Sequence, residues 1–294
     1  YIINSDDMQY DQWKVYPTAT VPWTKIKKWY DEGSYIPYTE KNPEDLINVL
    51  IDMMKSVPPW IRLNRVVRDI PNTTRDGTLY IYAGNKVTNL RQILHNRLDE
   101  KGDFCSCIRS REVKKNLDLV KYAQCVVRDY PSSGGQEYFI SIESGNHPNS
   151  VFNNGNWYIG NKREPGIIYG FLRLRLSKDS GNSYFPELQN SSLVRELHVY
   201  GQVASKNNKN KQYNKTQHKG FGKILMNKAE EISLNNGYKK ISVISGIGVR
   251  KYYEKLGYKM INTYMIKELY NNTNIYLSIL VLILGIMLKY FIFP

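Results

Sequence analysis

The chain has 294 residues, 41% of them hydrophobic, which is enough to form the cores of about two domains. Its 41 Lys and Arg residues outnumber 27 Asp and Glu residues and give a formal net charge of +14. This excess favours an anionic partner, either nucleic acid or a membrane surface, without choosing between them. Three cysteines argue against a disulfide scaffold and indicate a reducing compartment. Because the chain opens on Tyr1, we expect that an N-terminal part is missing.

The first 71 residues are rich in aromatic side chains and contain one predicted helix. Asn42 suits the N-cap of this helix, Pro43 suits its first turn, and Pro58 follows its end. Apolar residues recur at helical spacing between these limits, namely Leu46, Val49, Leu50, Met53 and Met54. We expect this apolar stripe to face a core.

The region from 72 to 135 is predicted to connect two domains. A second helix is expected over 89–101, with leucine and isoleucine side chains on one face and Gly102 after its end. Its apolar face also predicts a core position.

Short runs rich in β-branched and aromatic residues begin near Gln136 and predict strands. They are 137–144, 166–177, 193–201 and 239–245, with a helix before the last one. Strands mixed with helices indicate an α/β or α+β domain over 136–269. The polar run 205–215, "SKNNKNKQYNK", is typical of a loop insertion.

A glycine-containing stretch, "TQHKGFGKILMNKAEEI", starts the helix before that last strand. Helix N-termini leave backbone N–H groups unpaired and carry partial positive charge, which attracts phosphate. Gly220 and Gly222 lack Cβ and allow a phosphate to come close, and Lys215, His218 and Lys219 add positive charge. The pattern predicts a pyrophosphate cradle; the alternative is a loop that simply needs two permissive residues.

A family resemblance joins these features. The order of strand, Gln217-x-x-Gly220-x-Gly222, helix, strand and "YYEKLGY" at 252–258 resembles the GNAT acetyltransferases, which implies acetyl-CoA as the cofactor. The blocks "VRELHVYG", "QHKGFGKILMNKAEEI", "VISGIGVRKYYEKLGY", "PPWIRLNRVVRDIP" and "DQWKVYPT" resemble, more closely, the Elongator catalytic subunits. That family joins a radical S-adenosylmethionine (SAM) domain to an acetyltransferase-like domain and modifies the wobble uridine of tRNA.

The resemblance also implies site residues. Acetyl-CoA would contact Glu196, Leu197, His198, Val199, Gln217, Gly220, Phe221, Gly222, Lys223 and Tyr253. Tyr253 would protonate the departing thiolate, since a phenol with a pKa near 10 suits that role; its alternative is packing within an aromatic pair. His198 is a candidate general base, with a hydrogen-bonded histidine at a strand edge as the alternative.

Five arginines are candidates for contacts with tRNA phosphates. They are Arg62, Arg65, Arg68, Arg109 and Arg111. The alternative is a solvated strand face with local carboxylate pairs.

The cysteines depart from the family pattern. The cluster cysteines of the radical domain are absent, so this chain cannot run the radical step alone; the [4Fe–4S] cluster and SAM are expected in the full-length protein. The segment "CSCIRSREV" resembles a C-x-C-x-x-C segment of some relatives that has the pattern of a zinc site, but Ser110 replaces the third cysteine. Cys105 and Cys107 with His95 or Cys125 make a weak ligand set, and we predict no metal site.

The run 275–293, "IYLSILVLILGIMLKYFIF", contains one charge, Lys289. As a helix it would be roughly 28 Å long, about the thickness of a bilayer core. We expect a C-terminal membrane anchor, with a buried C-terminal helix as the alternative. The anchor would leave the catalytic part in the cytosol, with the mitochondrial outer membrane favoured over the endoplasmic reticulum.

The predicted fold class is α/β: the end of a radical SAM-type barrel domain, a GNAT-type domain and a C-terminal transmembrane helix. The predicted boundaries are 1–71, 72–135, 136–269 and 270–294. The predicted function is acetyl-CoA-dependent modification of the tRNA wobble uridine with tRNA-stimulated acetyl-CoA hydrolysis, as an enzyme with tRNA, other Elongator subunits and a membrane as partners. The alternatives are a lysine acetyltransferase acting on histone or tubulin, and a non-catalytic module that binds acetyl-CoA and tRNA.

Overall fold

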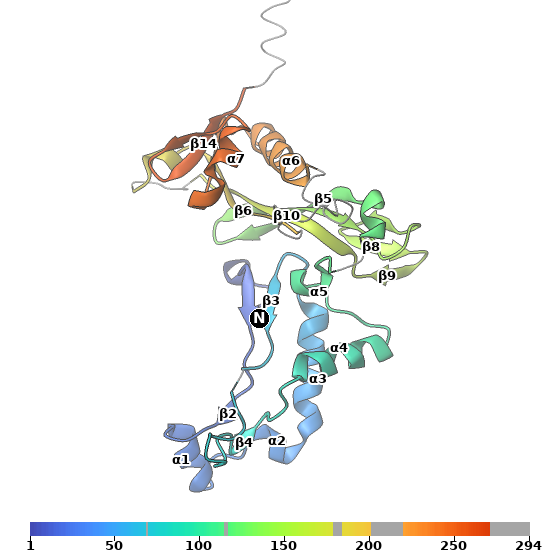
Figure 1. The fold of residues 1–294 in the computed structure, drawn as a ribbon, viewed down its shortest axis with the longest axis vertical. Helices are drawn as coiled ribbons and strands as arrows, with labels where there is room; N and C mark the ends of the chain where they lie inside the picture. Colours follow the sequence, from blue (N-terminus) through green and yellow to red (C-terminus); the bar gives the residue numbers. More distant parts are fainter. Residues whose placement is uncertain (69, 115–116, 179–183, 201–219, 271–294) are drawn as a thin grey trace, which may run out of the picture. The chain divides into compact units, whose positions relative to one another are not determined.

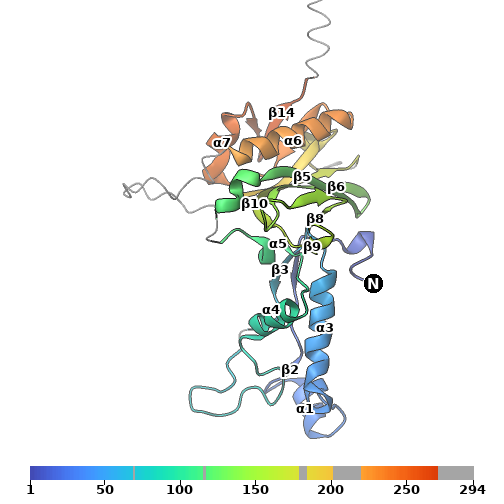
Figure 2. The same cartoon turned by 90° about the vertical axis from the view of Figure 1, so that its right-hand side faces the viewer.

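The computed structural model describes residues 1–68, 70–114, 117–178, 184–200 and 220–270. The chain forms two compact units, seen in two views in Figures 1 and 2. The first comprises Tyr1–Gln124 with Ile142–Tyr169, and the second comprises Cys125–Ser141 with the chain from Gly170 onward.

The first unit combines helices with three small sheets. Its helices are α1 Lys25–Asp31, α2 Tyr38–Lys41, α3 Pro43–Ser56, α4 Leu90–Glu100 and α5 Ile108–Arg111. One sheet pairs β1 (Gln12–Lys14) with β3 (Arg62–Arg65) in parallel, and another pairs β2 (Ala19–Thr20) with β4 (Ala83–Gly84). The third is formed by β7 Val151–Asn153, β8 Asn156–Ile159 and β9 Lys162–Glu164.

The two predicted helices of this unit are confirmed as α3 and α4. Asn42 caps α3 by accepting a hydrogen bond from the Glu44 backbone N–H at 3.2 Å. One core contains side chains of α3, α4 and β3, namely Leu50, Ile51, Met54, Leu63, Leu90, Leu94 and Leu98. Val49, expected on the same stripe, is 65% exposed, so that assignment was wrong.

The second unit is built on a seven-stranded sheet with the order β13-β14-β12-β11-β10-β6-β5. The strands are β5 Gln124–Ser132, β6 Gly135–Ser144, β10 Ile167–Leu176, β11 Ser192–Val199, β12 Lys240–Val243, β13 Lys259–Ile261 and β14 Tyr264–Glu268. The long helix α6 (Phe221–Asn235) packs on β11 and β12, and the short helix α7 (Arg250–Glu254) lies near β13 and β14. The four predicted strands are present. Sequence reasoning missed β5, β13 and β14, so the sheet starts at Gln124 rather than near 136.

The fold class needs one correction, at its predicted transmembrane helix. Within the described ranges, no helix is long and apolar enough to cross a membrane. The run 275–293, on which that prediction rested, lies outside the described residues. The membrane anchor is therefore withdrawn, together with the membrane partner and the mitochondrial outer membrane location derived from it. The inner domain boundaries stay a prediction.

Candidate functional site

The centre of the second unit is a place where two parallel strands part. β11 pairs with β12 only from Ser192 to Val194, and the last contact is the Ile244 N–H donating to the Val194 carbonyl at 3.0 Å. Beyond Val194, the described residues show β11 paired only with β10, as far as Val199. The β12 side of Arg195–Val199 therefore offers strand backbone for an extended ligand to pair with.

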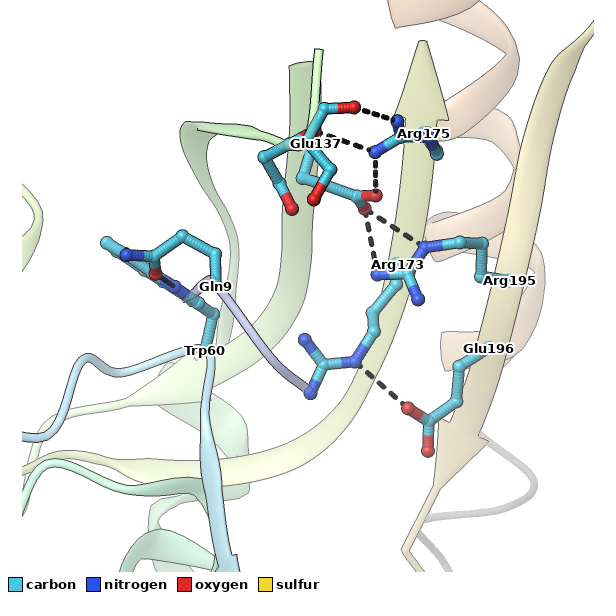
Figure 3. Close-up of polar contacts among 9 residues, drawn as sticks. Gln9, Trp60, Glu137, Arg173, Arg175, Arg195 and Glu196 are labelled. Carbon is cyan, nitrogen blue, oxygen red and sulfur yellow. Dashed lines mark hydrogen bonds and ion pairs between the residues drawn. The ribbon is translucent and has the colours of Figure 1, made fainter. Parts of the chain in front are cut away.

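A β-bulge fixes the direction of side chains along Arg195–Val199. Arg173 lies opposite Glu196 while Leu174 lies opposite Val194, so Arg195 is the extra residue. The Arg195 guanidinium is bound by Glu137 of β6, at 3.0 and 3.2 Å. Because of the bulge, the consecutive residues Arg195 and Glu196 both find partners on the same face of the sheet (Figure 3). Arg195 pairs with Glu137, and Glu196 pairs with Arg173.

Glu196 is held by a buried cation. Arg173, whose side chain is 1% exposed, donates from Nε to Glu196 Oε2 at 3.0 Å. The Arg173 guanidinium carbon lies 5.4 Å and 5.6 Å from the ring centroids of Phe139 and Phe171. These aromatic contacts restrain the arginine. Glu196 is thus a half-exposed carboxylate with one oxygen anchored by Arg173 (Figure 3).

His198 lies next along the same face and is exposed. Its ring stacks on the Phe171 ring, with 5.8 Å between the ring centroids, and packs edge-on against the Tyr200 ring, with 4.5 Å between the centroids. Leu197 and Val199 alternate with these polar residues, as expected for a strand. A Cβ built on Gly222 would lie 3.8 Å from Val199 Cγ2, so Val199 points toward the start of α6.

The N-terminus of α6 has the expected form. Gly220 is the N-cap, with a φ of 71°, and a Cβ there would meet no atom of the described residues within 4 Å. Phe221 starts the helix and is buried, whereas Lys223 is exposed. The backbone N–H groups of this first turn could therefore receive an anion. Gln217, Lys215, His218 and Lys219 lie outside the described residues.

Gly222 is needed for a reason that its sequence position did not reveal. A Cβ at this position would come within 2.5 Å of the Tyr252 hydroxyl oxygen. That hydroxyl is buried and has no hydrogen-bond partner within the described part of the chain. Tyr252 therefore places an unsatisfied phenol against the first turn of α6, a position that favours a polar ligand group.

Tyr253, the predicted proton donor, is 5% exposed. Its ring packs edge-on against Tyr252 at 5.2 Å and Tyr258 at 6.0 Å. Burial, aided by Tyr252, raises the pKa of Tyr253 to about 12. The phenol therefore keeps its proton throughout the neutral range, as a donor must.

The candidate tRNA-binding arginines, all in the first unit, lie in unlike surroundings. Arg62 is half-buried and pairs with Glu112, while Arg65 and Arg68 are exposed. Arg109 is exposed and donates from Nη1 to the Asn64 carbonyl. Partial burial and the charges of Arg91 and Arg62 lower the pKa of Arg109. Arg91 and Arg109 donate to the adjacent carbonyls of Leu63 and Asn64 on β3.

Arg111 is different, because its side chain is only 1% exposed. Its guanidinium forms an ion pair with the buried carboxylate of Glu143 at 3.1 Å. It also donates to the backbone carbonyls of Ser106 at 2.7 Å and Pro59 at 2.6 Å. Arg111 is therefore a core residue of the first unit, and we drop it from the proposed phosphate-binding set.

The cysteines of the described residues do not form an iron–sulfur or zinc site. Cys105 and Cys107 are buried and Cys125 is exposed, all as free thiols. Among the described residues, no group of three His, Cys, Asp or Glu side chains could hold a metal ion.

Two family models match the chain. The Radical_SAM C-terminal domain matches residues 10–100, and the Acetyltransferase (GNAT) family matches residues 214–258. Over 266 residues the chain is 37% identical to Elongator complex protein 3 of Schizosaccharomyces pombe. Over 276 residues it is 36% identical to tRNA uridine(34) acetyltransferase of Methanocaldococcus infernus. These alignments cover 88% and 91% of this chain.

The chain is a homologue of these two groups of proteins. The resemblance seen in its motifs is thereby confirmed, and so is an α/β fold with radical SAM and GNAT parts. A solved structure of the archaeal Methanocaldococcus infernus relative with an N-terminal deletion agrees, with a TM-score of 0.71, 34% identity and 91% of this chain covered. The chain spans 43% and 46% of the two relatives' lengths, and 57% of that solved chain.

Sequence reasoning missed three residues of these sites: Arg173, Tyr252 and Arg91. The alternation Leu172-Arg173-Leu174-Arg175 was a usable signal, because it places both arginines on one face of a central strand. No sequence signal pairs Tyr252 with Gly222, since their contact depends on how α7 packs.

Proposed function

We propose that the second unit binds acetyl-CoA where β11 leaves β12 beside the N-terminus of α6. The parting of these strands is the observation that carries the proposal, because it opens strand backbone next to an anion-binding helix end. The backbone of Glu196–Val199 and the turn of Gly220, Phe221, Gly222 and Lys223 would hold the cofactor, with Gln217 and Tyr253 as further contacts.

The proposed activity is acetyl-CoA-dependent modification of the tRNA wobble uridine, in line with the names of the two relatives. Acetyl-CoA would supply an activated acetyl group as a thioester. Tyr253 holds a proton for the leaving sulfur, and Glu196 or His198 accepts one from the attacking group. A tRNA-stimulated hydrolysis of the thioester belongs to this proposal.

The first unit would bind tRNA through phosphates. The net charge of +14 and the grouping of Arg62, Arg65 and Arg109, with Arg68 nearby in sequence, support this role. Other Elongator subunits are proposed partners because one relative is described as an Elongator complex protein. SAM and a [4Fe–4S] cluster would act in a full-length protein, and no residue described here is assigned to them.

The experiment measures release of free thiol from acetyl-CoA by the purified chain, with and without tRNA. Release that tRNA stimulates at least several-fold supports the proposal. Transfer of radiolabelled acetyl to a histone or tubulin lysine would favour a lysine acetyltransferase instead. Tight acetyl-CoA binding with no release under any condition would favour a non-catalytic module.

Two matched variants separate the candidate bases. Glu196→Gln and His198→Gln each remove one proton acceptor from the same strand face while the β10–β11 pairing remains. Replacement of the residue that acts as the base should lower the rate of thiol release by about 10²-fold or more, with little change in acetyl-CoA affinity. Equal, small effects of both substitutions would contradict base catalysis from this face.

A further inference from the structure

A compact cluster in the first unit surrounds the segment 105–110. Cys105 and Cys107 are 2% and 0% exposed. Ser110 stands where a C-x-C-x-x-C segment has its third cysteine, and its Oγ lies 3.2 Å from Cys107 Sγ. The segment thus brings Ser110, at the position of the third cysteine, next to the Cys107 sulfur, although Ser110 carries a hydroxyl instead of a thiol.

A cation from another helix enters this cluster. Arg91, in the first turn of α4, places Nη2 at 3.8 Å from Cys107 Sγ and at 3.4 Å from Ser110 Oγ. Its Nη1 donates to the Leu63 carbonyl of β3 at 2.9 Å. One guanidinium therefore links α4 to the start of α5 and to β3.

We propose that Arg91 takes the place of a metal ion in this cluster, which is a metal-free staple joining α4, α5 and β3. A zinc ion needs three or four donor atoms converging on one point. Here the polar atoms around Cys107 converge on the N–H groups of a permanent cation. A guanidinium that holds these positions excludes a dication by charge and by occupancy.

The electrostatics of the cluster agree with this geometry. A hydrogen bond from Cys105 lowers the pKa of Cys107, as do Ser110 and the charge of Arg91, while burial opposes them. The pKa of Cys105 is raised by the same hydrogen bond and by burial. Burial and the charge of Arg91 lower the pKa of His95.

The staple has a consequence for the basic surface. Arg109 lies between Cys107 and Ser110 in sequence, and it donates to the Asn64 carbonyl next to the one that Arg91 binds. Two arginines thus fix adjacent carbonyls of β3, the strand that carries Arg62 and Arg65. The staple sets the spacing of these side chains, and this conclusion does not depend on the proposed function.

The first test measures zinc by mass spectrometry in the purified full chain after expression in zinc-supplemented medium. We expect far less than one zinc per chain and a thermal unfolding midpoint that a chelator does not change. The double substitution Arg91→Ala with Ser110→Cys restores three thiols and removes the cation, and should take up about one zinc per chain. Stoichiometric zinc in the parent protein, lost together with stability on chelation, would overturn the proposal.

The second test measures the staple itself. Arg91→Gln should lower the unfolding midpoint by roughly 3–10 °C, because hydrogen bonds to a charged group are lost from a buried cluster. Arg97→Gln is the matched control on the same helix, since within the described part of the chain Arg97 forms an exposed pair with Glu44 at 3.6 Å, and the substitution should change the midpoint little. Should Arg91→Gln prove insoluble, Arg91→Lys retains the charge and should show a smaller loss. Either Arg91 variant as stable as the parent would refute the staple.

Discussion

The candidate site of the second unit is made mainly of backbone groups, whereas that of the first unit is made of side chains. In the second unit, the proposed acetyl-CoA site consists mainly of backbone: the part of β11 beyond its pairing with β12, a helix N-terminus and a left-handed glycine. In the first unit, the basic surface consists of side chains held on β3, α4 and α5 by ion pairs and the Arg91 cluster. The two sites should therefore respond differently to substitution.

A backbone site tolerates most side-chain changes but fails where a glycine or one aromatic hydroxyl is altered. A site made of side chains loses affinity gradually as its charged residues are removed. Replacing the buried residues that hold those side chains in place instead causes a large loss of stability. Four experiments test this contrast.

The largest effect is expected at Tyr253. Tyr253→Phe keeps the ring packed against Tyr252 and Tyr258 and removes only the hydroxyl. Thiol release should fall by roughly 10²–10⁴ with acetyl-CoA affinity retained. Since burial raises the pKa of Tyr253 to about 12, above its ordinary value near 10, the parent rate should not decline through deprotonation of Tyr253 below about pH 10. A Phe variant as fast as the parent would show that Tyr253 only packs, and Tyr252→Phe is the matched comparison.

The next effect concerns a buried support of the side-chain site. Arg111→Met leaves the Glu143 carboxylate buried without its cation, which costs about 3–5 kcal/mol of unfolding free energy. Chemical denaturation measures this loss. Arg65→Gln, an exposed position in the same unit, is the control and should cost less than about 0.5 kcal/mol. Equal stability of the two variants would show that Arg111 is not a core residue.

A smaller effect is expected at Gly222. Gly222→Ala puts a Cβ 2.5 Å from the Tyr252 hydroxyl, so the phenol must move away from the first turn of α6. Acetyl-CoA affinity measured by calorimetry should fall about tenfold, equal to about 1.4 kcal/mol. The double variant Gly222→Ala with Tyr252→Phe should recover part of this loss if the clash is the cause. Unchanged affinity in a folded Gly222→Ala protein would contradict the cradle.

The smallest effect of a substitution is expected in tRNA binding. Affinity should fall steeply with salt, because Lys and Arg contacts release counterions from phosphates. Replacing Arg62 and Arg65 with Gln should weaken binding and reduce the log–log salt slope by about 0.7–0.9 per lost contact. Arg97→Gln on α4 serves as a charge-matched control for one lost cation. If the tRNA affinity of the parent protein did not depend on salt, charged side chains of the first unit would not be binding tRNA phosphates, and the contrast with the backbone site would be wrong.

Local patterns predicted much of this molecule. Asn42 before Pro43 and the leucines of 89–101 predicted α3 and α4, because capping and helical periodicity act over a few neighbouring residues. The glycines at 220 and 222 predicted the start of α6 for the same reason. The expected transmembrane helix was the failure: it relied on hydropathy alone, and the described residues contain no helix able to cross a membrane.

The sequence by itself thus determined the helices, the main strands, the net charge and the family resemblance, all of which are encoded in short runs. Tertiary structure decided which charges are usable. Arg111 and Arg109 stand two positions apart, yet one is buried against Glu143 and the other is exposed. Likewise, only folding brings Arg91 to Cys107, Arg173 to Glu196 and Tyr252 to Gly222. Each of these contacts joins residues that are 16 or more positions apart, and their pairing depends on packing that no local pattern specifies.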